Sequence, residues 1–169
     1  MANAREILSR MKSVQDTRKI TNAMYLISST KLKKSKKLLE ETEPYFYSLQ
    51  DLIRRILRHM PDVEHFYFNP RKEIKEEDRV KGLIVITGDK GLAGAYNHNV
   101  LKMAQEWMEQ GDNHRLYVVG ELGRHYFEAR HVQVEEQFHY TVQNPTMHRA
   151  RLISSTILED YEEGRLDEV

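Results

Sequence analysis

The first 43 residues of the chain contain no glycine and no proline, and this stretch constrains the fold more than any other feature. Most of its residues favour helix, so the sequence predicts one helix from Asn3 to about Glu43. At 1.5 Å per residue, such a helix is roughly 60 Å long. A domain of this size has a radius of gyration of only about 15–16 Å. We therefore expect a helix that projects from the rest of the protein and needs a partner.

The predicted helix is apolar only in patches. A seam with alternating three- and four-residue steps starts at Ile7 and continues through Met11, Val14, Arg18, Thr21, Tyr25, Ser28, Leu32, Ser35 and Leu39. Arg, Thr and Ser interrupt this seam, whereas a self-sufficient coiled coil is apolar at nearly every such position. A second short stripe on a neighbouring face consists of Ile20, Met24 and Ile27. The pattern suits a helix that pairs with one partner and presents a smooth side to another. Periodicity alone also fits an ordinary amphipathic core helix.

Charge is unevenly distributed, although the formal net charge of the chain is +0. Residues 1–43 carry ten Lys or Arg against five acids, a balance of +5, which leaves −5 for the remainder. The densest basic run is Lys31–Lys37. It is interpreted as a solvated helix face, a nucleic-acid arm or a contact for an acidic protein. The neutral total and the lack of zinc-finger, RNP-like or GXXG motifs weaken the nucleic-acid alternative.

Length and composition set further limits. A chain of 169 residues has room for one domain plus an extension. It contains no apolar run of about 18 residues, which predicts no membrane span. The charged, periodic N-terminus does not resemble a signal peptide. The absence of cysteine excludes disulfides and thiol catalysis within these residues.

Three regions are expected along the chain. Residues 1–60 form the helical region, in which Pro44 either kinks one helix or opens a second one over Tyr45–Met60. Residues 61–79 form a polar loop or linker. Residues 80–169 alternate strands and helices, which predicts an α/β domain with a mainly parallel, Rossmann-like sheet. The expected strands cover Leu83–Thr87, Leu116–Gly120 and Val132–Phe138, and the expected helices cover Asn99–Glu109, Glu121–Arg130 and 144–163.

The glycine-rich turn after the first expected strand is the one segment that suggests a nucleotide site. Its glycines stand at positions 88, 91 and 94, whereas the dinucleotide fingerprint requires G-x-G-x-x-G. Lys90 does not have the spacing of a P-loop lysine either. The glycines are interpreted as serving a tight turn. No cofactor, metal site or catalytic group is predicted, because the eight histidines are scattered and the acids lie in polar segments.

Several motifs, in order along the whole chain, resemble the gamma subunit of rotary ATP synthases. They are Ser9–Met24, Lys31–Ser35, Thr87–Asn97, Asn144-Pro145 and Tyr161–Asp167. The turn departs from the family pattern at Ala93 and Ala95, which stand where the family has Cys and a second Gly.

The resemblance implies a non-catalytic central-stalk rotor subunit. The N-terminal helix would form half of an antiparallel coiled coil inside the alpha and beta subunits, and the α/β domain would contact the epsilon subunit and the membrane c-type ring. Rotation would couple proton or sodium movement to catalytic sites on beta. The subunit would be peripheral to the cytoplasmic face of a bacterial plasma membrane. The expected partner contacts are Ile7, Met11, Val14, Ile20, Met24, Ile27, Lys31, Lys33 and Lys34.

The resemblance also implies an N-terminal portion without the C-terminal shaft helix, so that the α/β domain is incomplete at its C-terminal end. An isolated chain with an exposed helix and an open sheet edge is expected to self-associate. The proposed seam for this association runs through Ile7, Met11, Val14, Tyr25, Leu32 and Leu39.

Overall fold

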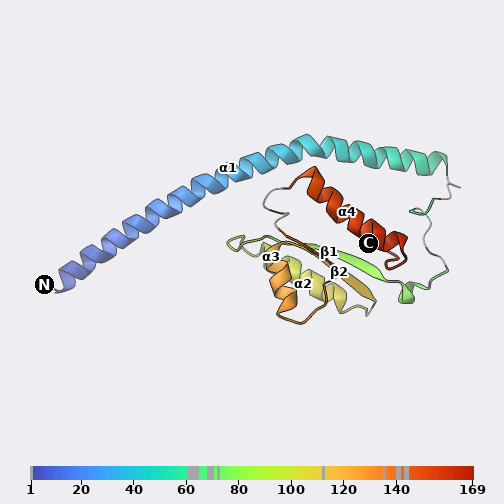
Figure 1. The fold of residues 1–169 in the computed structure, drawn as a ribbon. Coiled ribbons are helices and arrows are strands. Elements are labelled where there is room, and N and C mark those ends of the chain that lie inside the picture. The colour runs from blue at the N-terminus through green and yellow to red at the C-terminus, as the bar shows by residue number, and fades with distance from the viewer. Residues whose placement is uncertain are drawn as a thin grey trace. The chain divides into compact units, whose positions relative to one another are not determined.

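The computed structural model describes residues 2–60, 65–67, 71, 73–111, 113–134, 136–139, 142 and 145–169. The chain divides into two compact units, residues 1–64 and residues 65–169. The described residues of the predicted linker 61–79 therefore all belong to the second unit. Figure 1 shows the elements of both units.

The first unit is a single helix, α1 (Ala2–His59), of 58 residues. It runs through Pro44, so the two predicted helices are one, the first of the two expected alternatives. Proline lacks the backbone N–H that would continue the helical hydrogen bonds. The Ser48 hydroxyl donates to the Pro44 carbonyl oxygen at 2.8 Å in the same turn. Figure 1 shows that α1 bends along its length but does not break.

The second unit is an α/β domain, as predicted. Its elements are the 3-10 turn η1 (Glu76–Asp78), β1 (Lys81–Ile86), α2 (Tyr96–Met108), β2 (His114–Val119), α3 (Glu121–Glu128), β3 (Glu136–Phe138) and α4 (Met147–Glu162). The strands form a parallel sheet in the order β1-β2-β3. Glu168 adds a parallel bridge to Lys81 on β1.

The sheet is covered on both faces. Figure 1 shows α2 and α3 on one side and α4 on the other. Successive residues of β2 point to opposite faces, and this strand supplies both layers of the core. The layer under α2 and α3 contains Val85, Leu101, Ala104, Leu116, Val118 and Phe127. The layer under α4 contains Tyr117, Val119, Phe138, Ile157 and Leu166.

Asp160 ties α4 to the sheet from within the second core layer. Burial alone would raise the pKa of this carboxyl, but hydrogen bonds from Tyr117 and Arg165 outweigh it and lower the pKa below its ordinary value. Tyr117 lies at the centre of β2 and is fully buried. The carboxylate therefore joins a helix, a strand and the C-terminal segment in one network.

A second set of polar contacts holds the segment before β1 against the C-terminal segment of the α/β unit. The Arg71 guanidinium donates to Asp167 Oδ1 and to the Tyr161 carbonyl oxygen, each at 2.5 Å, and it lies 4.8 Å from the centroid of the Tyr161 ring. Asp167 Oδ2 accepts the backbone N–H of Val80 at 2.8 Å. These contacts explain why residue 71 belongs to the α/β unit rather than to a free linker.

Element boundaries differ locally from those expected. The third strand covers Glu136–Phe138 only, because the Val132 N–H bonds the Phe127 carbonyl in the turn that ends α3. Helix α2 begins three residues before the predicted Asn99. The predicted start at Asn144 lies outside the described residues. Thr146 caps α4 by accepting the Arg149 N–H at 3.3 Å.

Candidate functional site

The surface of α1 is the main candidate for partner binding. Between Asn3 and His59 no residue is buried, and only Ser29 and Gln50 are partly covered. The six apolar residues predicted as contacts each expose between 48% and 67% of their surface. This many exposed apolar side chains make the surface of α1 a candidate interaction site.

The six apolar residues divide between two faces of α1. At about 100° per residue, Ile7, Met11 and Val14 lie close together on one side of the helix. We call this side, with its continuation at Tyr25, Leu32 and Leu39, the Ile7 face. Ile20 is rotated about 140° from Ile7 around the helix axis. The predicted contacts therefore cannot meet a single flat partner.

The second stripe is much longer than the sequence pattern first indicates. Three- and four-residue steps from Ile20 continue through Pro44 almost to the end of α1. We call this side the Ile20 face, and it consists of Ile20, Met24, Ile27, Lys31, Lys34, Leu38, Glu41, Tyr45, Leu49, Leu52 and Ile56. All eight of its apolar residues are exposed.

The three predicted lysines do not act as one patch. Lys31 and Lys34 interrupt the apolar Ile20 face, whereas Lys33 lies about 140° away from it. All three are exposed. The structure therefore separates two lysines that share a helix face with apolar residues from one that does not.

Several hydroxyl groups on α1 are hydrogen-bonded to the backbone of the helix itself. Thr17, Thr21 and Thr30 each donate to the carbonyl oxygen four residues earlier, at 2.9 Å. The hydroxyl donors of these three threonines, which lie on different sides of α1, are therefore used within the helix rather than offered to a partner.

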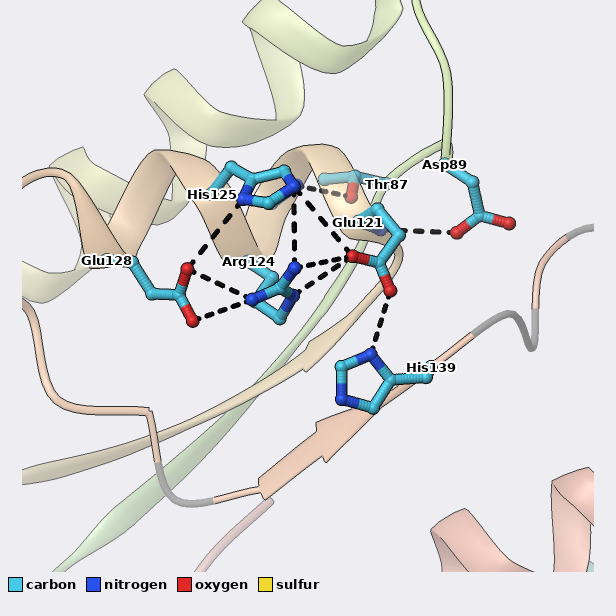
Figure 2. A network of polar contacts seen from close by, with 8 residues as sticks. Thr87, Asp89, Glu121, Arg124, His125, Glu128 and His139 are labelled. Carbon is cyan, nitrogen blue, oxygen red and sulfur yellow. Dashed lines mark hydrogen bonds and ion pairs between the residues drawn. The ribbon is translucent and has the colours of Figure 1, made fainter.

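A second candidate site lies where the three parallel strands end. Asp89 follows β1, Glu121 follows β2 and His139 follows β3, so the topology brings them to one edge of the sheet. Glu121 Oε1 pairs with His139 Nδ1 at 2.8 Å, and Glu121 Oε2 accepts Arg124 Nη2 at 2.8 Å (Figure 2). We call these four residues the Glu121 cluster.

Hydrogen bonds to His139 and Arg124 hold the pKa of Glu121 below its ordinary value. The same pairing, chiefly the hydrogen bond to Glu121, raises the pKa of Arg124. Arg124 also bonds Glu128 at 2.9 Å, as Figure 2 shows. Both groups are held in their charged forms, so the cluster is suited to a structural tie rather than to proton transfer.

The first turn of α3 uses its backbone donors within the protein. The N–H of Glu121 bonds Asp89 Oδ1 at 3.2 Å, that of Leu122 bonds the Gly88 carbonyl at 3.2 Å, and that of Gly123 bonds Thr87 Oγ1 at 2.9 Å. This helix start therefore does not present free N–H groups to a phosphate. No group of metal-binding side chains occurs among the residues that the structure describes.

Sequence reasoning did not identify the Glu121 cluster, because its members are distant in the chain: Asp89 and Glu121 lie 32 residues apart, and Glu121 and His139 lie 18 residues apart. The sequence signal that could have identified the cluster is the position of its residues relative to the predicted strands. Each residue closely follows a predicted strand, and the carboxyl ends of parallel strands meet at one edge of a sheet.

Comparisons with known proteins complete the description of these surfaces. A family model described as ATP synthase matches residues 3–169. The ATP synthase gamma chain of Acetivibrio thermocellus is 44% identical over 169 residues, which cover 100% of this chain and 57% of the relative. The gamma chain of Ruminiclostridium cellulolyticum is 46% identical, covering 99% of this chain and 56% of the relative. A protein of Acetobacterium woodii, named ATP synthase gamma chain, sodium ion specific, is 35% identical, covering 99% of this chain and 54% of the relative.

Proposed function

This chain belongs to the ATP synthase gamma chain family, and we propose that it forms the N-terminal part of the central stalk of an ATP synthase. It spans little more than half the length of the curated relatives it matches. The observation that carries the proposal is the match along the whole chain, together with a 58-residue helix that has no buried residue between Asn3 and His59.

In this proposal α1 is the shaft that turns inside the ring of alpha and beta subunits. Its two separated apolar faces allow one side to pack on another helix while the opposite side meets the ring. The inward-bonded threonines support a bearing that holds no orientation strongly. Tight contacts in one orientation would raise the barrier to leaving it.

The α/β unit has its own two-layer core and can serve as a separate binding module. We assign to it the contacts with the epsilon subunit and the membrane c-type ring. The protein would then be peripheral to the cytoplasmic face of a bacterial plasma membrane. In the described part of the chain, no helix combines the length and apolar character needed to cross a bilayer.

The rotor would couple ring rotation to catalytic sites on beta and would do no chemistry itself. The coupling ion would be a proton or sodium, and one relative is named as sodium ion specific. The alternative of a free-standing basic module that binds nucleic acid or an acidic protein is not favoured. The family match extends over residues 3–169 rather than being confined to the Lys31–Lys37 region.

The proposal is tested in the ATP synthase assembled with this chain, using Met24→Lys. Met24 lies on the Ile20 face between Ile20 and Ile27, with 48% of its surface exposed. A cation added there creates an orientation-dependent attraction or repulsion in the bearing. Ion transport per ATP hydrolysed should fall by more than the yield of assembled complex does.

The matched control is Asn22→Lys, which adds the same charge about 160° around the helix from Met24. We expect this variant to retain more coupling than Met24→Lys. Equal coupling in the wild-type complex and in both variants would contradict the rotor role of this face. Failure of the chain to copurify with alpha and beta subunits would contradict the proposal altogether.

A further inference from the structure

Pro44 lies inside α1, at a point where the backbone hydrogen bonding of the helix is incomplete. Proline has no backbone N–H, so the Glu40 carbonyl oxygen does not receive the helical hydrogen bond that residue 44 would otherwise donate. The proline ring also crowds this carbonyl and pushes the two turns apart on that side of the helix. Figure 1 shows α1 changing direction in its second half, where its colour passes from blue to turquoise. The helical hydrogen bonding is therefore weakest between residues 40 and 44.

Two hydroxyl side chains flank the proline and bond to the backbone of the neighbouring turns. The Thr42 hydroxyl donates to the Leu38 carbonyl oxygen at 2.7 Å. The Ser48 hydroxyl donates to the Pro44 carbonyl oxygen at 2.8 Å. A hydroxyl that bonds the carbonyl oxygen four residues earlier competes with the backbone N–H for that oxygen and favours bending of the helix. Bending is therefore favoured on both sides of Pro44 and not only at the proline itself.

Side-chain charges do not brace this segment. Within residues 2–60, each ion pair that the structure shows lies wholly before Pro44 or wholly after it. Glu43, directly before the proline, has no Lys or Arg three or four residues away in either direction. Its neighbour across one turn is Glu40, and like charges at this spacing destabilise a helix. The surface of α1 therefore adds no support where the backbone bonding is weakest.

We propose that residues 40–48 form a bending joint in α1, at which the helical segments before and after it change their angle to each other while both stay helical. The joint follows from the backbone chemistry of α1 alone, so it is present whether or not another helix packs on α1. Its use in a rotor rests on the proposed function. There the segment before the joint follows the ring of alpha and beta subunits, and the segment after it keeps its own direction.

The joint concentrates bending at known residues. A continuous α-helix resists bending because hydrogen bonds tie each turn to the next. One missing bond and two shared carbonyl oxygens lower this resistance at one place in a helix of 58 residues. The bend therefore collects at residues 40–48 instead of spreading along the helix, and the segments on either side remain stiff.

Distances between paired spin labels test the joint, because the chain contains no cysteine and labels attach only at introduced ones. Lys19, Lys37 and Arg55 follow each other at intervals of 18 residues, or about five turns. They lie on one side of the helix, off both the Ile7 face and the Ile20 face. Lys37→Cys with Arg55→Cys spans the joint. Lys19→Cys with Lys37→Cys spans an equal length of helix without it and is the matched control.

A straight helix would give both pairs the same separation, about 27 Å along the axis. Pro44 lies only about 20° around the helix from the labelled side, so opening of the helix at the proline moves the labels apart. A kink of about 20° lengthens the Lys37–Arg55 separation by about 2–3 Å. We expect a distribution longer by this amount and at least about 1.5 times as broad as that of the control pair. Pro44→Ala, which restores the N–H, should bring it to the length and breadth of the control.

The measurements are made in the 169-residue chain and in the ATP synthase assembled with it. Labelled chain is diluted into unlabelled chain, so that only distances within one chain are recorded. Far-ultraviolet circular dichroism verifies that the variants keep their helix content. In the chain, a distribution across Pro44 as narrow as that of the control would overturn the joint, and so would one that Pro44→Ala leaves unchanged.

In the assembled complex, the distribution across the joint should stay broader than that of the control pair. Narrowing to the breadth of the control there would overturn the use of the joint in the rotor. A chain with the broad distribution that does not copurify with alpha and beta subunits would support the joint and contradict the proposed function instead.

Discussion

α1 and the α/β unit contain the same kinds of apolar residue but use them in opposite ways. Every large apolar side chain of α1 is exposed, whereas Leu116, Val118 and Phe127 of the α/β unit are each only 1% exposed. Burial of such side chains is the main favourable term in folding. The α/β unit therefore owes its stability to contacts within the chain, and α1 has its apolar surface available for partners. Substitutions in the two regions should be detected by different measurements.

The largest expected effect comes from truncating the core of the α/β unit. Phe127→Ala removes a ring from the layer under α2 and α3 and should cost about 3–5 kcal/mol of unfolding free energy. Leu26→Ala on α1, where the side chain is 63% exposed and lies off both apolar faces, should cost no more than about 0.5 kcal/mol.

Urea unfolding separates the two regions when it is followed by two probes. Trp107 is the only tryptophan and lies in α2, so its fluorescence reports the α/β unit. Circular dichroism also reports α1. If Leu26→Ala shifted the fluorescence transition as far as Phe127→Ala does, the contrast between a self-sufficient unit and a partner-dependent helix would be wrong.

The next largest effect on the unfolding free energy is expected at Gly120 of the α/β unit, and Gly91 provides the contrast. Gly120 has φ of +109°, and a Cβ there would lie 2.3 Å from the Thr87 carbonyl oxygen, so Gly120→Ala should cost at least about 2 kcal/mol. Gly91, in the glycine-rich turn, has nothing within 4 Å of an added Cβ, and Gly91→Ala should be nearly neutral. Urea midpoints of the two variants provide the measurement. A costly Gly91→Ala would mean that the turn is more constrained than its open surroundings indicate.

This pair of glycines also shows what the sequence can and cannot predict. The strands and helices of the α/β unit follow from apolar runs and turn residues, because these are local signals. The special role of Gly120 depends on the approach of Thr87, 33 positions earlier in the chain, and no local pattern contains that information. The sequence pattern drew attention to the glycine-rich turn instead, although a Cβ added at its middle glycine, Gly91, would meet nothing within 4 Å.

The candidate surfaces were predictable to different degrees. Ile20, Met24 and Ile27 were identified from spacing, but their continuation to Ile56 was not, because Pro44 left open whether one helix or two would form. The Glu121 cluster depends on parallel strand order, which brings distant residues to one edge. Contact of α1 with the alpha and beta subunits remains a prediction.

The smallest expected effect contrasts ion pairs in the two regions. Glu121 bonds His139 and Arg124 and its side chain is 15% exposed, whereas Glu6 of α1 bonds only Arg10 among the described residues and is 61% exposed. Glu121→Gln should lower the unfolding free energy at neutral pH by about 1 kcal/mol, and Glu6→Gln should have almost no effect.

The pH dependence distinguishes this ionic contribution from simple loss of packing. The pKa of Glu121 is lowered on folding, so its charged form stabilises the fold fully above its ordinary pKa of 4.5. That stabilisation is lost as the pH falls through the lower pKa of the folded state. The difference between wild type and Glu121→Gln, measured by urea unfolding with Trp107 fluorescence, should therefore be largest near neutral pH and shrink progressively below about pH 4.5. A difference that stayed constant with pH would show that the carboxylate charge does not hold α3 to the end of β3. The Glu121 cluster would then be no more important to stability than the exposed pairs along α1.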